Sequence, residues 1–135
     1  MLPSGLAEVV ADEEDLARFL TQSNHFNTEV VKPAALLPSP ESRETSVFRH
    51  GPSPLNTLWA IGLEAVGTRP LYGAAIFKAA VVRDALLTVE PKEPPPRHAV
   101  ILKWPWMESD PDLQKAKRKE LAILIVSAAG APVLR

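Results

Sequence analysis

Apolar residues recur at helical spacing in two stretches that also carry start and stop signals. Residues 55–66 are preceded by a Ser-Pro pair, which is typical of a helix start, and are followed by Gly67, which is typical of a helix end. The second stretch begins at an Asp-Pro pair, residues 110–111, and ends at Gly130. The pattern predicts that the inward side of this last helix consists of Leu113, Ala116, Leu121, Leu124, Ile125 and Ala128.

Two further helices are predicted from less complete patterns. Asp12 can cap a helix whose apolar side would come from Leu16, Phe19 and Leu20. The Ala-rich stretch 73–86 favours a buried helix. Its opening stretch LYGAA is equally compatible with a strand.

Three short stretches have the composition of strands. Residues 45–50 form a β-type run that ends at a Gly-Pro pair, and residues 86–90 form another that Pro91 closes. Residues 99–104 are apolar on both faces apart from one lysine, which is typical of an interior strand. The prolines within residues 93–96 predict an extended, exposed connection that leads into this strand.

This mixture of elements lacks the regular alternation of strand and helix that a parallel sheet requires, so the sequence predicts the α+β class. We expect a single compact domain over residues 1–135. It would contain about four helices packed on a small sheet of about three strands. Residues 1–11 are expected to form a loosely ordered N-terminus.

Composition narrows the classes of function. The formal net charge is −1 over 135 residues, which gives no electrostatic reason to expect a nucleic acid or an acidic surface as the partner. The absence of cysteine excludes disulfides, thiolate catalysis and thiolate zinc sites. The N-terminus lacks the basic start of a secretion signal, and charged residues interrupt the longest apolar stretch, residues 71–87. We therefore expect a soluble, cytoplasmic protein that does not enter a membrane.

The sequence contains none of the short motifs that identify common enzymes. A glycine-rich nucleotide loop, a phosphate-loop lysine, HExxH and GxSxG are all missing. His25, His50 and His98 are too far apart for the spacing of metal ligands. We therefore predict neither a metal nor a cofactor.

The pair Arg-His occurs twice, as Arg49–His50 and as Arg97–His98, each time at the end of a predicted strand. Strand alternation places the arginine and the histidine of a pair on opposite faces, with the histidines toward the bulkier apolar side. One interpretation is structural, with neutral and hydrogen-bonded imidazoles. The other is a site for a phosphate or carboxylate, in which one histidine donates a proton.

The arginines of the two pairs would emerge on the same side of a sheet if their strands are neighbours with aligned ends. Adjacent guanidiniums repel and cannot lose their protons, so a negative group must lie near them. We expect an internal acid at Arg49 and Arg97, drawn from Glu44, Glu90 and Glu93, and the alternative is a ligand phosphate.

Two other groups of residues are candidates for binding. Lys115, Arg118 and Lys119 share one flank of the last predicted helix, which is either a solvated surface or a small face that contacts phosphates. Trp104 and Trp106 flank a proline. They either pack against the core and the adjoining turn or present an exposed ring that stacks on a base or anchors a partner. An adaptor would have a flat exposed apolar patch that includes Trp106 or Phe26.

The stretches LARFL, VKPAALLP, ETSVFRHG, LWAIG and RHAVILKWP resemble segments of a set of small bacterial proteins with no known activity. The resemblance covers about residues 16–104 and implies a bacterial, cytoplasmic, single-domain protein. It transfers no functional residue.

From these observations we predict a non-enzymatic binding or adaptor module of a bacterial protein complex. Its protein partner would contact Arg49, Arg97, Trp106 and the basic flank of the last helix. The alternative is a small enzyme that acts on a phosphorylated or nucleotide-like substrate through the two Arg-His pairs. A third interpretation is nucleic-acid binding through the basic last helix.

Overall fold

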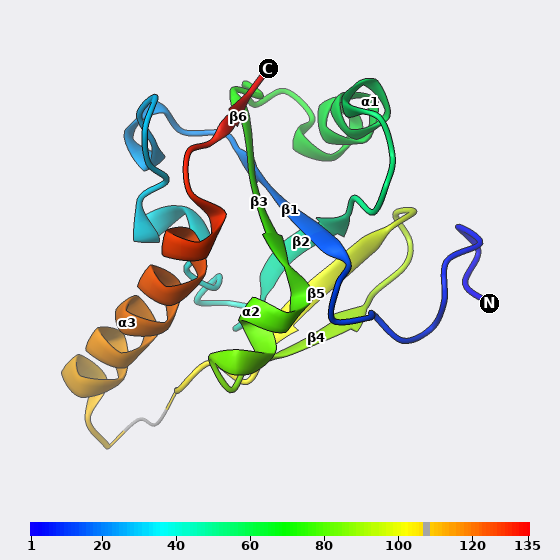
Figure 1. Ribbon diagram of the computed structural model, residues 1–135. Coiled ribbons are helices and arrows are strands. Elements are labelled where there is room, and N and C mark those ends of the chain that lie inside the picture. The colour runs from blue at the N-terminus through cyan, green and yellow to red at the C-terminus, as the bar shows by residue number, and fades with distance from the viewer. Residues whose placement is uncertain (107–108) are drawn as a thin grey trace.

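Six strands form one antiparallel sheet with the order β4-β5-β2-β1-β3-β6 in the computed structural model, which describes residues 1–106 and 109–135 (Figure 1). The strands are β1 (Asp15–Leu20), β2 (Thr45–Arg49), β3 (Gly73–Lys78), β4 (Thr88–Pro91), β5 (His98–Leu102) and β6 (Val133–Leu134). The α-helices are α1 (Leu55–Val66), α2 (Ala79–Asp84) and α3 (Pro111–Ala129), and the 3₁₀ turns are η1 (Ser23–His25) and η2 (Pro33–Leu36).

The α+β class predicted from the sequence is confirmed, and the predicted number of elements is wrong. The described residues contain three α-helices and six strands, whereas we expected about four helices and about three strands. Two of the additional strands, β1 and β3, lie in predicted helical stretches, and the third, β6, follows the last helix, where no strand was predicted. Within the described ranges, no helix has both the length and the apolar character needed to cross a membrane.

The predicted first helix is in fact β1, which lies between β2 and β3 in the sheet. Leu16 and Leu20 lie on one face and are fully buried, and Ala17 is fully buried on the other face. The apolar residues therefore serve two sides of a strand instead of one side of a helix. Apolar residues at positions 16, 19 and 20 fit one side of a helix, and they also fit a strand that is buried on both faces. The pairing of this stretch with two neighbouring strands decides in favour of the strand.

The predicted helix over residues 73–86 is also wrong in its first half, where the alternative of a strand is correct. β3 ends at Lys78 and α2 begins at the next residue. Ala74 and Ala75 are both fully buried, because the strand is covered on its two faces. Gly73 lies so close to β6 that a Cβ atom there would be 2.3 Å from the carbonyl oxygen of Val133. Small residues are thus required by close packing of the sheet.

Local signals place the ends of α1 and α3 well. Gly67 follows α1 with a positive φ of 64°, a conformation that glycine adopts without strain. Asp110 caps α3, because its side chain accepts a hydrogen bond from the backbone N–H of Leu113, and Gly130 follows the helix. The predicted inward side of α3 is partly wrong. Leu113 and Leu124 are about half exposed, and the buried residues are Gln114, Ala122, Ile125 and Val126.

The predicted interior strand is confirmed as β5, which lies between β4 and β2. The connection over residues 93–96 is not extended, however. It turns back to form a hairpin, in which the backbone N–H of Lys92 donates to the carbonyl of His98 and that of His98 donates to the carbonyl of Pro95. The prolines at 94–96 are exposed, as predicted. We name residues 93–96 the triproline turn.

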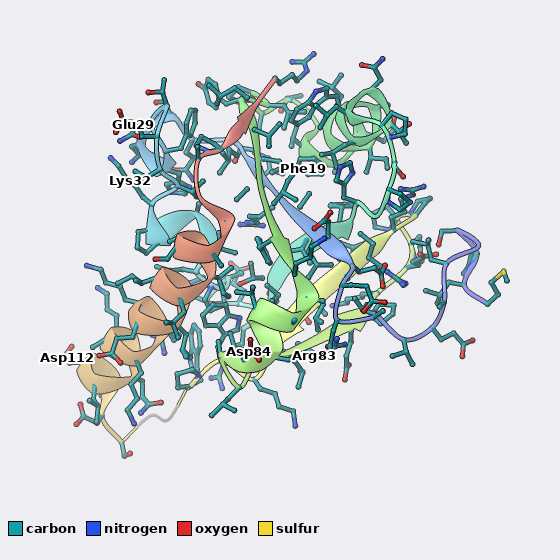
Figure 2. All side chains as sticks on the ribbon, in the orientation of Figure 1. Phe19, Glu29, Lys32, Arg83, Asp84 and Asp112 are labelled. Atoms are coloured by element: carbon teal, nitrogen blue, oxygen red, sulfur yellow. The ribbon has the colours of Figure 1, made fainter. Side chains whose placement is uncertain are left out.

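The two faces of the sheet have different coverings (Figure 1). α2, α3 and η2 pack on one face and form the main core with residues such as Leu16, Phe77 and Ile101. α1 packs on the other face, where Leu58 meets the apolar residues of β1 and β3. Phe19 is on this side of β1 (Figure 2). The cavities described below lie where this second face continues over β2 and β5.

Candidate functional site

The strands that carry the two Arg-His pairs are neighbours with aligned ends, since Phe48 pairs with His98 and the backbone N–H of Arg49 donates to the carbonyl of Arg97. Arg49 is only 2% exposed. Its Nε and Nη2 atoms donate to the two carboxylate oxygens of Glu14, at 2.7 and 3.0 Å. Its Nη1 atom donates to the carbonyl of Ala7 at 2.6 Å. An internal acid thus pairs with Arg49, but it is none of the three acids that we expected.

Arg97 is half-buried and donates through Nη1 to the hydroxyl of Ser53 at 2.5 Å and to the carbonyl of His50 at 3.3 Å. Its backbone N–H donates to the carboxylate of Glu93, which also accepts two hydrogen bonds from Ser4. Burial alone would raise the pKa of Glu93, but these hydrogen bonds and the charge of Arg49 lower it overall. Both guanidiniums are therefore engaged by internal groups, and a ligand contact for either arginine stays a prediction.

His50 is half-buried, and within the described part of the chain its Nδ1 atom has no hydrogen-bond partner. Burial lowers the pKa of His50, the nearby charge of Asp15 raises it, and Arg97 lowers it, with a net decrease. An imidazole in this environment is neutral near pH 7. The structural interpretation also required a hydrogen-bonded imidazole, so His50 does not decide between that interpretation and a site for an anion, and both stay predictions.

His98 differs from His50, because both of its ring nitrogens make hydrogen bonds. Nδ1 lies 2.8 Å from the carbonyl oxygen of Lys92, and Nε2 lies 2.5 Å from the hydroxyl oxygen of Ser46. A carbonyl can only accept, so Nδ1 carries the proton. Nε2 of the neutral ring therefore holds a lone pair and accepts the hydrogen bond of Ser46. The result is a hydroxyl, an imidazole and a carbonyl in series.

The register between β2 and β5 brings Ser46 and His98 together. Ser46 pairs with Val100, and Phe48 pairs with His98, so Ser46 and His98 are diagonal neighbours on one face of the sheet. The ring of His98 also packs on the ring of Phe48, with centroids 5.2 Å apart. Sequence reasoning missed Ser46. The available signal was that Ser46 lies two residues before Phe48 and so points to the same face of the strand. That signal cannot identify His98 as the neighbour of Ser46 until the register between the strands is known.

Two cavities flank the pair formed by Ser46 and His98. The first cavity, of about 270 Å³, is also lined by Arg18, Thr21 and Arg69. The second cavity, of about 240 Å³, is lined by Arg18 as well, together with residues of the loop before β2 that include Glu44. Glu44 makes an ion pair with Lys92. Among the residues that the structure describes, no carboxylate lines the first cavity, and its two arginines give it two positive charges.

Arg18 lies at the point where β1 and β2 separate. Their ladder ends with Ala17 opposite Phe48, and beyond it Nη1 of Arg18 donates to the carbonyl of Ser46 at 2.9 Å. Nε donates to the carbonyl of Ala35 at 2.8 Å. Burial lowers the pKa of Arg18, and the charge of Arg69 lowers it further. Among the residues that the structure describes, no carboxylate forms an ion pair with Arg18.

The other candidate residues lie away from this site. The guanidinium of Arg118 lies 3.9 Å from the ring centroid of Trp106, and Arg118 also donates to the carbonyl of Pro105 at 2.8 Å. Lys115 and Lys119 are exposed beside them on α3, and with Trp106 they line a shallow groove of about 480 Å³. Asp112, which lines the same groove, is on the first turn of α3 (Figure 2). None of the residues from this groove named here lines either cavity beside His98.

Over the described ranges, 1–106 and 109–135, no group of three histidine, aspartate or glutamate side chains is placed to hold a metal ion. The polar side chains that line the first cavity are two guanidiniums, two hydroxyls and one oriented imidazole. Comparisons of the chain with protein-family models, with curated proteins and with solved structures find no match.

Proposed function

We propose that the protein binds a small organic anion in the first cavity, with the phosphate or carboxylate group of the ligand at Arg18 and Arg69. The observation that carries this proposal is the state of Arg18. A guanidinium has five N–H donors, and only two of the nitrogens of Arg18 make hydrogen bonds to the described residues. Nη2 makes none. Arg18 is thus a half-buried cation with unused donors, and it forms no ion pair with a carboxylate of the described residues, since Glu44 in the second cavity pairs with Lys92. Such a cation favours an anionic ligand.

The surroundings of Arg18 support the same proposal. Arg69 is exposed at the first cavity and adds a second positive charge. The hydroxyls of Thr21 and Ser46 line the cavity too, and hydroxyls commonly complete the hydrogen bonding of a bound phosphate or carboxylate. These four side chains come from three separate parts of the fold, so the sheet and the end of α1 position them together.

An apolar groove next to the first cavity supports a ligand with an apolar body. This groove has a volume of about 570 Å³ and lies between α1 and the triproline turn. It shares Phe48, Ala65 and Pro95 with the first cavity. A ligand could therefore place its charged group at the arginines and its apolar part over Phe48, which is the usual division of a small-molecule site.

The adaptor function predicted from the sequence stays a prediction. Phe26 and Trp106, the two aromatic residues that we considered as partner anchors, are half-buried. Phe26 packs on Tyr72 with ring centroids 5.5 Å apart, and Trp106 packs under Arg118. No geometric feature of these residues favours a protein partner over the anion at Arg18.

Calorimetric titration with phenyl phosphate, inorganic phosphate and benzyl alcohol tests the proposal. We expect phenyl phosphate to bind most tightly, because it fills both the first cavity and the apolar groove, and benzyl alcohol to bind least. Arg69→Gln should weaken phenyl phosphate binding by about tenfold, as expected for one charge-assisted hydrogen bond. Arg69 is exposed and makes one local hydrogen bond to the carbonyl of Val66, so the fold should persist.

The matched control is Lys117→Gln, which removes the same charge from an exposed position on α3. It should leave the affinity unchanged. Equal affinities of the Arg69→Gln and Lys117→Gln variants for phenyl phosphate would contradict the proposed site, as would the absence of binding to the unaltered chain.

A further inference from the structure

We propose that Ser46 is a nucleophile activated by His98, and that the protein hydrolyses carboxylic esters whose acyl part carries a negative charge. This inference rests on the proposed function, because the charge of the substrate would be held at Arg69. It adds a reaction to the binding site and assigns a role to the hydrogen bonds of His98, which binding of an anion does not require.

The geometry of Ser46 and His98 meets the requirement for an activated hydroxyl. A serine hydroxyl is a weak nucleophile until a base within hydrogen-bond reach removes its proton, and that base must itself be oriented by a third group. The separation of 2.5 Å between Oγ of Ser46 and Nε2 of His98 provides the first contact. The hydrogen bond from Nδ1 to the carbonyl of Lys92 provides the second and fixes the tautomer.

Access to the hydroxyl is equally necessary. Ser46 is exposed and lines both the first and the second cavity, so a substrate can reach Oγ from solvent. A hydroxyl that served only to satisfy a core histidine would be buried with it. Here Ser46 and His98 both line the two cavities, and the ring of His98 packs on the ring of Phe48.

Arg18 supplies the group that stabilises the developing negative charge. Its Nη1 atom is 2.9 Å from the backbone carbonyl oxygen of Ser46, so the guanidinium is adjacent to the proposed nucleophile. The unused N–H donors of Nη2 can bind the oxyanion that forms on the substrate carbonyl. Donors fixed in place before the reaction are the main source of such stabilisation. In this arrangement Arg18 binds the transient charge and Arg69 binds the permanent one.

The reaction balances without a cofactor. Oγ of Ser46 forms a bond to the ester carbonyl carbon while its proton passes to Nε2 of His98, and the carbonyl electron pair moves to oxygen. When that pair returns, the bond to the leaving alcohol breaks and His98 gives its proton to the alcohol oxygen. A water molecule then attacks the acyl group in the same way, which releases the carboxylic acid and restores the hydroxyl of Ser46.

The experiment compares two activated esters on the full chain, p-nitrophenyl hydrogen succinate and the neutral p-nitrophenyl butyrate. We measure release of p-nitrophenol and, by peptide mass spectrometry, the position of any acyl adduct. We expect a burst of p-nitrophenol and an adduct on Ser46. Ser46→Ala and His98→Gln should each lower the rate by about 100-fold or more, in line with the loss of a nucleophile or of its general base.

Controls separate this inference from the binding proposal. Ser127→Ala removes an exposed hydroxyl from α3 and should keep the full rate. Arg69→Gln should raise KM for the succinate ester and leave the butyrate ester unchanged. If phenyl phosphate binds but neither ester gives an adduct on Ser46, the role of Ser46 as a nucleophile is overturned and the anion site is left intact. Conversely, an adduct on Ser46 that forms equally well from both esters would support the nucleophile and contradict anion recognition at Arg69.

Two further outcomes overturn the inference directly. One is unchanged release of p-nitrophenol by Ser46→Ala, because lysines and histidines elsewhere can react with activated esters. The other is an adduct at any residue other than Ser46. Since Ser46 is exposed on β2, we expect Ser46→Ala to keep its circular dichroism spectrum and thermal midpoint. Ser46→Thr, which keeps the hydroxyl, should retain part of the activity and serves as a second variant.

Discussion

Arg18 and Arg49 lie on neighbouring strands and have opposite surroundings. Arg49 is buried against Glu14, and two parallel hydrogen bonds hold the pair together. Within the described part of the chain, Arg18 donates hydrogen bonds only to backbone carbonyls, and it lines two cavities. Arg49 was selected as a candidate site residue because a histidine follows it in the sequence, yet of these two arginines it is Arg18 that lines the cavities. Residue type and sequence neighbours did not distinguish the two, because the partner of each arginine comes from a distant part of the chain.

Replacing Glu14 by Gln should strongly destabilise the fold. The substitution leaves the guanidinium of Arg49 buried without a carboxylate, and the loss of one partner from a buried ion pair costs about 3–5 kcal/mol. Urea denaturation of the variant should show this decrease in the free energy of unfolding. Asp12→Asn is the matched control, because Asp12 is 68% exposed in its ion pair with Arg83 and should lose about 1 kcal/mol or less. Equal losses in the two variants would show that Arg49 does not depend on Glu14.

His50 should make stability depend on pH. Its pKa in the folded protein lies below the ordinary value of 6.5, chiefly because of burial. The unfolded chain therefore binds a proton before the folded chain does. The contribution of His50 is fully present above pH 6.5 and is lost as the pH falls from 6.5 toward the folded pKa.

We expect denaturant unfolding of the unaltered chain to show a loss of stability below pH 6.5 that is smaller in His50→Asn. The comparison variant is His25→Asn, because burial also lowers the pKa of His25. Identical pH dependence in the unaltered chain and in His50→Asn would contradict this prediction.

At the scale of elements, the helices were predictable from local chemistry and the strands only in part. Pro54, Gly67, Asp110 and Gly130 mark the ends of α1 and α3 in the sequence and in the structure. β1 and β3 carry no such markers, because a strand buried on both faces is defined by its neighbours in the sheet. The candidate site depends on these same neighbours. Ser46 meets His98 through the register of β2 and β5, and no spacing along the chain encodes that register.

Gly73→Ala should detach β6 from the edge of the sheet. The added methyl group would meet the carbonyl oxygen of Val133 at 2.3 Å, and backbone atoms cannot rotate away as a side chain can. We expect faster hydrogen exchange at the amide of Arg135, which donates to the carbonyl of Tyr72. The free energy of unfolding should fall by about 1–3 kcal/mol, as for other overpacked positions.

Truncation of the chain after Pro132 provides the control for this prediction. The truncated chain lacks β6, so Gly73→Ala should then be nearly neutral. A substitution that is equally costly with and without β6 would place the strain elsewhere than at the carbonyl of Val133.

At the scale of the whole molecule, the sheet divides structural support from the candidate chemistry. One face carries the main core under α2, α3 and η2. The other is covered by α1 over β1 and β3 and carries the cavities over β2 and β5. The sequence predicted the fold class because composition and helix signals are distributed along the chain. It could not predict a site that requires the order of all the central strands.

The triproline turn also has a thermodynamic consequence for any ligand of the apolar groove. Pro95 and Pro96 line this groove, and a pyrrolidine ring fixes φ and has almost no rotamer freedom. This part of the rim therefore has little disorder to lose when a ligand arrives. A flexible loop loses conformational entropy when it becomes ordered around a ligand, and this loss weakens binding. The stiff prolines avoid most of this loss, so the affinity is higher. Discrimination between ligands then falls to their shape, since a stiff rim does not adjust to a poor fit.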